Sequence, residues 1–188
     1  MSDETPERGR PEPWMRGIVA GIDPVVGHLI RAAEQVSEDA AGAIGGHTTV
    51  QLWAKPFGMT AAGFHAKHLA RSTERLSTYL AGRQLSPEQF AAMDTEGDGA
   101  ETAGELLAAI DAALARYGEM VRSLDPGNFG EVREIGRKRY RTTAISVAIH
   151  IAEHAQRHVG GMIAAAKLAR SSVPLPGGRG SERGSGTE

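Results

Sequence analysis

The residues with the clearest capacity for chemistry in this sequence are its seven histidines, which are unevenly distributed. His150, His154 and His158 recur every four residues, and His65 and His68 lie close together earlier in the chain. In a helix, a four-residue step turns by about 40° and rises about 6 Å, so neighbouring histidines can point at one ion. Imidazole is a common ligand of transition metals, so this spacing indicates a candidate metal site.

The amino-acid composition excludes several kinds of site and partner. There are no cysteines, which excludes disulfides, thiolate nucleophiles and iron–sulfur clusters and leaves His, Asp and Glu as metal ligands. The 21 Lys and Arg balance 23 Asp and Glu, and aromatic residues make up 5%, so we expect no nucleic-acid partner. No apolar stretch resembles a signal peptide or a membrane span, so we expect a cytoplasmic protein without a membrane partner.

The length of 188 residues suits a single domain with tails. Residues 1–13 are rich in proline and charge, and residues 171–188 are rich in glycine and serine. Such segments contribute little to a core. The sequence therefore predicts a flexible N-terminal tail, a single domain over residues 14–170 and a disordered C-terminal tail.

Helical periodicity recurs along this domain, whereas alternation with period two is almost absent, which indicates an all-α fold. Capping residues, prolines and glycines delimit the expected helices. The predicted long helices span about residues 24–44, 60–80, 101–124 and 142–169, with a short extra helix from Ser86 between the second and the third. Four helices of this length suit an antiparallel four-helix bundle. The long connection after the first helix permits a crossover and leaves the order of helix directions open.

The basic run from Arg133 to Arg141 contains five Lys and Arg and precedes the last helix. We expect an irregular segment at one end of the bundle. Such a run is usually a solvated loop, but it could also attract an anionic substrate or thiol.

The position of each histidine on its helix separates the candidates. In the last helix His158 falls within an apolar arc and His154 lies at its edge, whereas His150 lies farther round toward solvent. A pair of ligands is too few for a metal, so a third must come from another helix. The second helix offers His65 and His68, and periodicity does not choose between them. The competing interpretation is that these are hydrogen-bonded histidines at the boundary of the core.

Three segments together resemble the DinB-like superfamily of damage-inducible and YfiT-like bacterial proteins. They are LWAKP at residues 52–56, GFHAKHLA at residues 63–70 and HIAEHAQRHVGG at residues 150–161, and the likeness extends from about Trp14 to Arg170. The resemblance implies an up-up-down-down four-helix bundle, commonly a homodimer, that binds zinc or nickel. Carried over position by position, the implied ligands are His68, His154 and His158.

Three neutral imidazoles leave coordination positions open, as in catalytic rather than purely structural metal sites. The resemblance implies a thiol S-transferase, in which a metal-activated thiolate from a low-molecular-weight thiol attacks a small-molecule electrophile. A metal-dependent hydrolase is an alternative, and it would use a carboxylate near the ion as general base. Glu153 adjoins His154 in the sequence but points about 100° away from it, so it is a poor candidate for that base. A further alternative is a non-catalytic, stress-associated binding or structural protein whose metal fastens two helices together.

Overall fold

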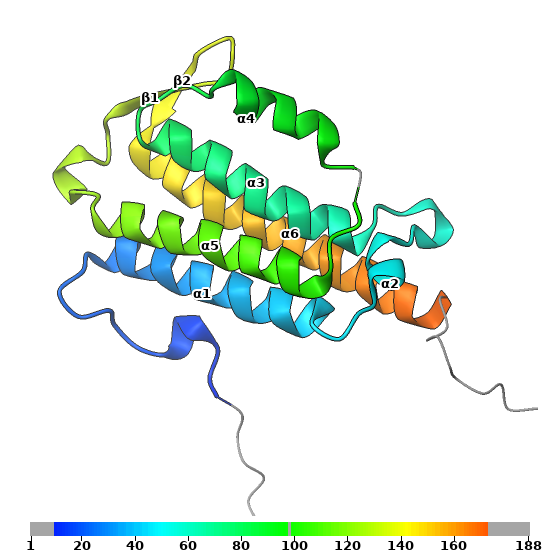
Figure 1. Ribbon diagram of the computed structural model, residues 1–188. Helices are drawn as coiled ribbons and strands as arrows, with labels where there is room; N and C mark the ends of the chain where they lie inside the picture. The colour runs from blue at the N-terminus through cyan, green and yellow to red at the C-terminus, as the bar shows by residue number, and fades with distance from the viewer. Residues whose placement is uncertain (1–9, 98, 173–188) are drawn as a thin grey trace, which may run out of the picture.

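The computed structural model describes residues 10–97 and 99–172. Within these residues, four helices of 19 residues or more lie side by side (Figure 1). They are α1 (Pro24–Ile44), α3 (Ala62–Leu80), α5 (Ala103–Arg122) and α6 (Ala144–Ser172). Helices α1 and α3 each pack against both α5 and α6. The predicted, mostly helical fold is thus confirmed, with four long helices around a common core.

The order of helix directions differs from the up-up-down-down arrangement that the resemblance implied. Helices α1 and α6 run in one direction and α3 and α5 in the other (Figure 1), which gives up-down-down-up in chain order. The reason lies in the connections. The first, with α2 (Thr49–Trp53) and η2 (Pro56–Gly58), stays at one end of the bundle, so α3 returns antiparallel to α1.

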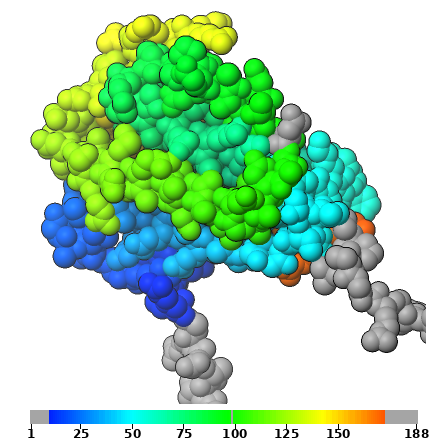
Figure 2. All heavy atoms as spheres, in the orientation of Figure 1, coloured from blue at the N-terminus to red at the C-terminus, as the bar shows by residue number. Residues whose placement is uncertain are grey.

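The crossover occurs in the connection between α3 and α5, which contains α4 (Pro87–Ala91) and η3 (Ala92–Thr95). This segment runs back along α3 and forms part of the molecular surface beside it (Figure 2). Arg71 of α3 holds it in place, since its guanidinium donates to the carbonyl of Ala92 at 2.9 Å and to the Thr95 hydroxyl at 3.0 Å. The segment after η3 therefore lies next to the middle of α3.

The helix ends follow local signals in the sequence. Asp23 caps α1 by accepting from the amides of its first turn, and Ser86 and Thr102 form capping boxes before α4 and α5. Thr143 caps the last helix, because its hydroxyl accepts from the Ser146 amide at 3.3 Å. Gly82, in the left-handed region with φ of 73°, follows the end of α3.

The basic run is a β-hairpin and not the expected irregular segment. Strands β1 (Val132–Ile135) and β2 (Tyr140–Thr143) pair antiparallel, and residues 136–139 form the turn. The strands are four residues each and lack the alternation that predicts a half-buried strand, which explains why the pattern was missed. Arg133 ties the hairpin to the end of α3, because its Nε donates to the Leu80 carbonyl at 2.7 Å.

The core consists of two contiguous clusters that draw on all four long helices. One surrounds Leu69 and Met162, and the other surrounds Tyr117 and Ile151. Tyr117 also donates its hydroxyl hydrogen to the Ala148 carbonyl at 2.8 Å, which links α5 to α6. These buried contacts fix the rotation of α3 and α6 about their axes, and so fix which side chains the two helices present to each other.

Residues 1–9 and 173–188, which hold most of the two predicted tails, lie outside the described residues, so the tails stay a prediction. Among the helices that the structure describes, none is long and apolar enough to cross a membrane.

Candidate metal centre

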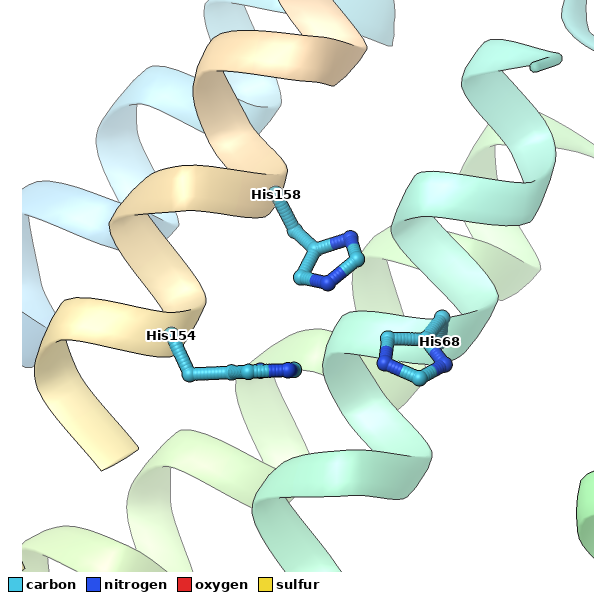
Figure 3. A group of neighbouring side chains, drawn as sticks. All are labelled: His68, His154 and His158. Carbon is cyan, nitrogen blue, oxygen red and sulfur yellow. The ribbon is translucent and has the colours of Figure 1, made fainter. Parts of the chain in front are cut away.

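Three histidines from two antiparallel helices meet at the α3–α6 interface. His68 comes from α3, and His154 and His158 come from successive turns of α6 (Figure 3). One ligand nitrogen from each ring lies within 4.8 Å of the other two. The ring centroid of His158 lies 4.4 Å from that of His68 and 4.6 Å from that of His154. The structure therefore brings together the three residues that the sequence analysis selected.

The α6 pair is positioned by local sequence. Ala155, Val159 and Met162 are buried at 2% exposure or less and turn one stripe of α6 toward the core. His154 and His158 lie at the edge of that stripe, where both side chains are partly buried. Because they are four residues apart, their rings lie next to each other on the same side of the helix.

On α3, His68 is held by a buried ion pair between Glu96, which follows η3 in the chain, and Arg75 of α3. The Nδ1 atom of His68 lies 2.5 Å from Oε2 of Glu96, and Oε1 of Glu96 lies 2.5 Å from the guanidinium of Arg75. Glu96 is 4% exposed and Arg75 is 8% exposed. A carboxylate at Nδ1 fixes the tautomer of a histidine and makes Nε2 a better ligand. Glu96 thus orients His68 with Nε2 free.

The other two histidines also have a neighbour at Nδ1. The Nδ1 atom of His154 lies 3.4 Å from the Ser72 hydroxyl, which itself donates to the Leu69 carbonyl at 3.2 Å. The Nδ1 atom of His158 lies 3.1 Å from Nδ1 of His65. Each ring therefore has its Nδ1 against the protein, and Figure 3 shows ring nitrogens of His68 and His158 directed into the space between the three side chains.

Burial and mutual repulsion keep the α6 pair neutral. Burial first, and then the electrostatic influence of His68, His150, Arg157 and Arg75, lowers the pKa of His154 to about 4. Burial, with His68, His154 and His65, lowers the pKa of His158 to about 3. A neutral imidazole has a free lone pair, so at pH 7 these ligands need lose no proton to bind a cation.

Sequence reasoning missed the partners of these histidines. Glu96 lies 28 residues after His68, in a segment without helical periodicity, and Arg75 looks like an ordinary helix-surface residue. The carboxylate that was considered, Glu153, is exposed and lies 4.0 Å from His150, whose side chain is also exposed. His150 therefore lies outside the cluster, as expected from its position on the helix.

Trp53 anchors the chain just beyond Glu96. Its indole N–H donates to the Glu101 carbonyl at 3.1 Å. A Cβ added at Gly99 would lie 1.9 Å from the indole ring, and one added at Gly63 of α3 would lie 2.8 Å from it. The indole therefore lies between two backbones that only glycine allows to approach so closely. This contact fixes the segment that carries Glu96 against α3.

Comparison with known protein families gives one assignment. The sequence model of the DinB superfamily matches residues 32–162, which include all three clustered histidines and Glu96. The chain belongs to the DinB superfamily. This confirms the family resemblance seen in the sequence motifs. No curated protein matches the chain significantly.

The donor set fits a divalent transition metal of the kind that the resemblance implies. Nitrogen ligands about 2.1 Å from a tetrahedral ion lie about 3.4 Å apart, so separations of up to 4.8 Å close with small side-chain rotations. The rings of His154 and His158 are neutral, and the second nitrogen of each of the three rings has a neighbour, as is usual for metal-binding histidines. Three such ligands leave at least one coordination position for a small molecule.

Proposed function

We propose that this chain binds one divalent metal ion, zinc or nickel, through Nε2 of His68, His154 and His158. We further propose that it uses the ion to join a low-molecular-weight thiol to a small-molecule electrophile. The observation that carries the proposal is the convergence of three imidazoles whose other nitrogens already face Glu96, Ser72 and His65. Membership of the DinB superfamily supports it.

When bound, such an ion supplies Lewis-acid chemistry, because it lowers the pKa of a thiol or a water that reaches its open coordination positions. The chain supplies the rest. Three neutral imidazoles leave the charge of a divalent cation uncompensated, and the buried Glu96–Arg75 pair holds the ring of His68 in one orientation. In the overall transfer the thiol loses its proton to solvent, and its sulfur forms a bond to the electrophilic atom. The leaving group departs with the electron pair of the bond that breaks.

The carboxylates near the cluster favour the thiol over hydrolysis by an activated water. A hydrolase that activates water through a general base needs a free carboxylate. Glu96 has one oxygen on His68 and the other on Arg75, and Glu153 is exposed beside His150. Neither is placed to take a proton from a water, so base-assisted hydrolysis lacks its base here, and a small thiol needs none because its unperturbed pKa is far below that of water.

The non-catalytic alternative has its own supporting observation. The cluster spans α3 and α6, so an ion held there would fasten the two helices together. That alternative predicts a large gain in stability on metal binding without turnover. The homodimer and the cytoplasmic location expected from the sequence stay predictions in either case.

The test begins with metal content. The purified protein, saturated with Zn²⁺ or Ni²⁺ and freed of excess by gel filtration, should hold about one ion per chain by elemental analysis. His68→Ala, His154→Ala and His158→Ala should each lose that ion while circular dichroism stays helical. His150→Ala is the matched control, because it removes an exposed histidine from the same helix and should keep the metal.

The reaction is then assayed with bacillithiol, mycothiol or glutathione and a chlorinated nitroarene. Metal-dependent loss of thiol in the wild type, absent in the three alanine variants, supports the transferase. Stoichiometric metal with no turnover for any thiol favours the non-catalytic alternative. No stoichiometric metal in the wild type, or metal kept by the three variants, contradicts the proposed site.

A further inference from the structure

His65 is the nearest histidine to the cluster that the proposed ligand set leaves unused. It lies on α3 one turn before His68, and its side chain is half-buried. Its ring centroid is 5.3 Å from that of His158, and the two Nδ1 atoms are 3.1 Å apart. This is hydrogen-bond distance, so one nitrogen must carry the proton and the other must accept it.

The ligand assignment fixes the direction of this bond. If Nε2 of His158 gives its lone pair to a metal, a neutral His158 must carry its proton on Nδ1. His158 is then the donor, and Nδ1 of His65 is the acceptor. His65 in turn carries its own proton on Nε2. A neutral imidazole would thus do for His158 what the carboxylate of Glu96 does for His68.

A glycine on α6 makes room for the ring of His65. A Cβ added at Gly161 would lie 2.7 Å from Cε1 and 2.8 Å from Nε2 of His65, closer than real Cβ contacts. A Cβ added at the adjacent Gly160 would have no neighbour within 4 Å. Glycine inside a helix costs about 1 kcal/mol relative to alanine. Of the two glycines, only Gly161 has a packing reason to be there.

We propose that His65 is a positioning residue for His158, and that Gly161 allows it to be one. By accepting the Nδ1 proton, His65 selects the tautomer of His158 in which Nε2 is the ligand, and it holds the ring in place. The inference rests on the proposed metal site. It adds that the last helix requires glycine at position 161 and that position 160 has no such requirement.

The metal test uses Co²⁺, whose absorption reports the number and type of ligands, in competition with a chelator. His65→Leu removes the acceptor and should weaken Co²⁺ binding about tenfold. His65→Asn places an amide oxygen near the position of Nδ1, so its affinity should stay within about threefold of the wild type. Gly161→Ala should behave like His65→Leu, while Gly160→Ala, the matched control on the same helix, should bind as the wild type does.

A second readout needs no metal. Imidazole ¹⁵N shifts of the metal-free protein should show His158 protonated at Nδ1, and His65→Leu should convert it to a mixture of tautomers. A His65→Leu protein with wild-type affinity and an unchanged His158 tautomer overturns the inference. So does a His65→Asn protein that loses the metal with an altered Co²⁺ spectrum, because His65 would then be a ligand. If the wild type binds no Co²⁺ but shows the tautomer change, the metal proposal fails and the positioning contact stands.

Discussion

The two helices that carry the clustered histidines orient them by different means. On α6 the four-residue spacing alone places His154 and His158 on one face, and their Nδ1 atoms lie near uncharged side chains. On α3 the single ligand candidate, His68, is oriented by the buried Glu96–Arg75 ion pair. One half of the site follows from local sequence, whereas the other depends on a tertiary contact and on charge. The α3 half should therefore be the more easily broken.

The largest expected effect is the loss of stability when one charge of the Glu96–Arg75 pair is removed and the other stays buried without its partner. Arg75→Met keeps the buried stem but removes the cation beside Glu96, and breaking a buried pair in this way costs about 3–5 kcal/mol of unfolding free energy. Urea denaturation of the metal-free protein measures it. Removing both charges, in Arg75→Met with Glu96→Gln, should recover much of the loss. A double variant as unstable as the single one would show that the pair is not the source.

The same difference explains how much of the molecule the sequence predicts. The helix starts at Asp23 and Ser86 depend on neighbouring residues, so capping rules find them. That His154 and His158 share one face of α6 depends only on a four-residue step. For these features the interacting groups lie within one or two helical turns, so a short stretch of sequence is enough to predict them.

What could not be predicted depends on residues far apart in the chain. Glu96 reaches His68 only because the segment after α3 folds back along that helix, and nothing in its own sequence indicates this. The same return path produces the up-down-down-up order, which helix lengths alone leave open. Periodicity also could not choose between His65 and His68, since both lie near the same face of α3. The family resemblance selected His68, and the structure places His68 in the cluster and His65 beside His158.

A smaller effect is expected from disturbing the anchor of the Glu96 segment. Gly99→Ala would place a methyl 1.9 Å from the Trp53 ring, and such overpacking typically costs about 1–3 kcal/mol. It should also weaken Zn²⁺ binding, because a displaced segment would move the Glu96 carboxylate away from Nδ1 of His68. Gly97→Ala is the matched control, since a Cβ there has no neighbour within 4 Å. Equal stability and Zn²⁺ affinity in the two variants would show that Trp53 does not hold this segment.

The charge difference between the two halves can be measured directly. Glu96→Gln keeps an acceptor near Nδ1 of His68 but removes the negative charge, and it should weaken Zn²⁺ binding about tenfold. Ser72→Ala removes the neutral partner of His154, whose contact is long at 3.4 Å, so its effect should stay below about threefold. Chelator competition gives both affinities. An equal loss of Zn²⁺ affinity in the two variants would show that the negative charge of Glu96 does not strengthen metal binding.

The smallest expected effect is the pH dependence that the α6 half gives to the metal-free protein. In the folded chain the pKa of His154 is lowered to about 4 and that of His158 to about 3, against about 6.5 when unfolded. Below about pH 6.5 the unfolded chain therefore takes up protons that the folded chain refuses, so stability falls with pH down to about 4. Both side chains are only partly buried, and solvent screening reduces the effect. Urea midpoints of chelator-treated protein at about pH 7.5 and about pH 5 should show a larger drop for the wild type than for the double variant His154→Ala with His158→Ala. The same drop in both proteins would place the acid sensitivity elsewhere.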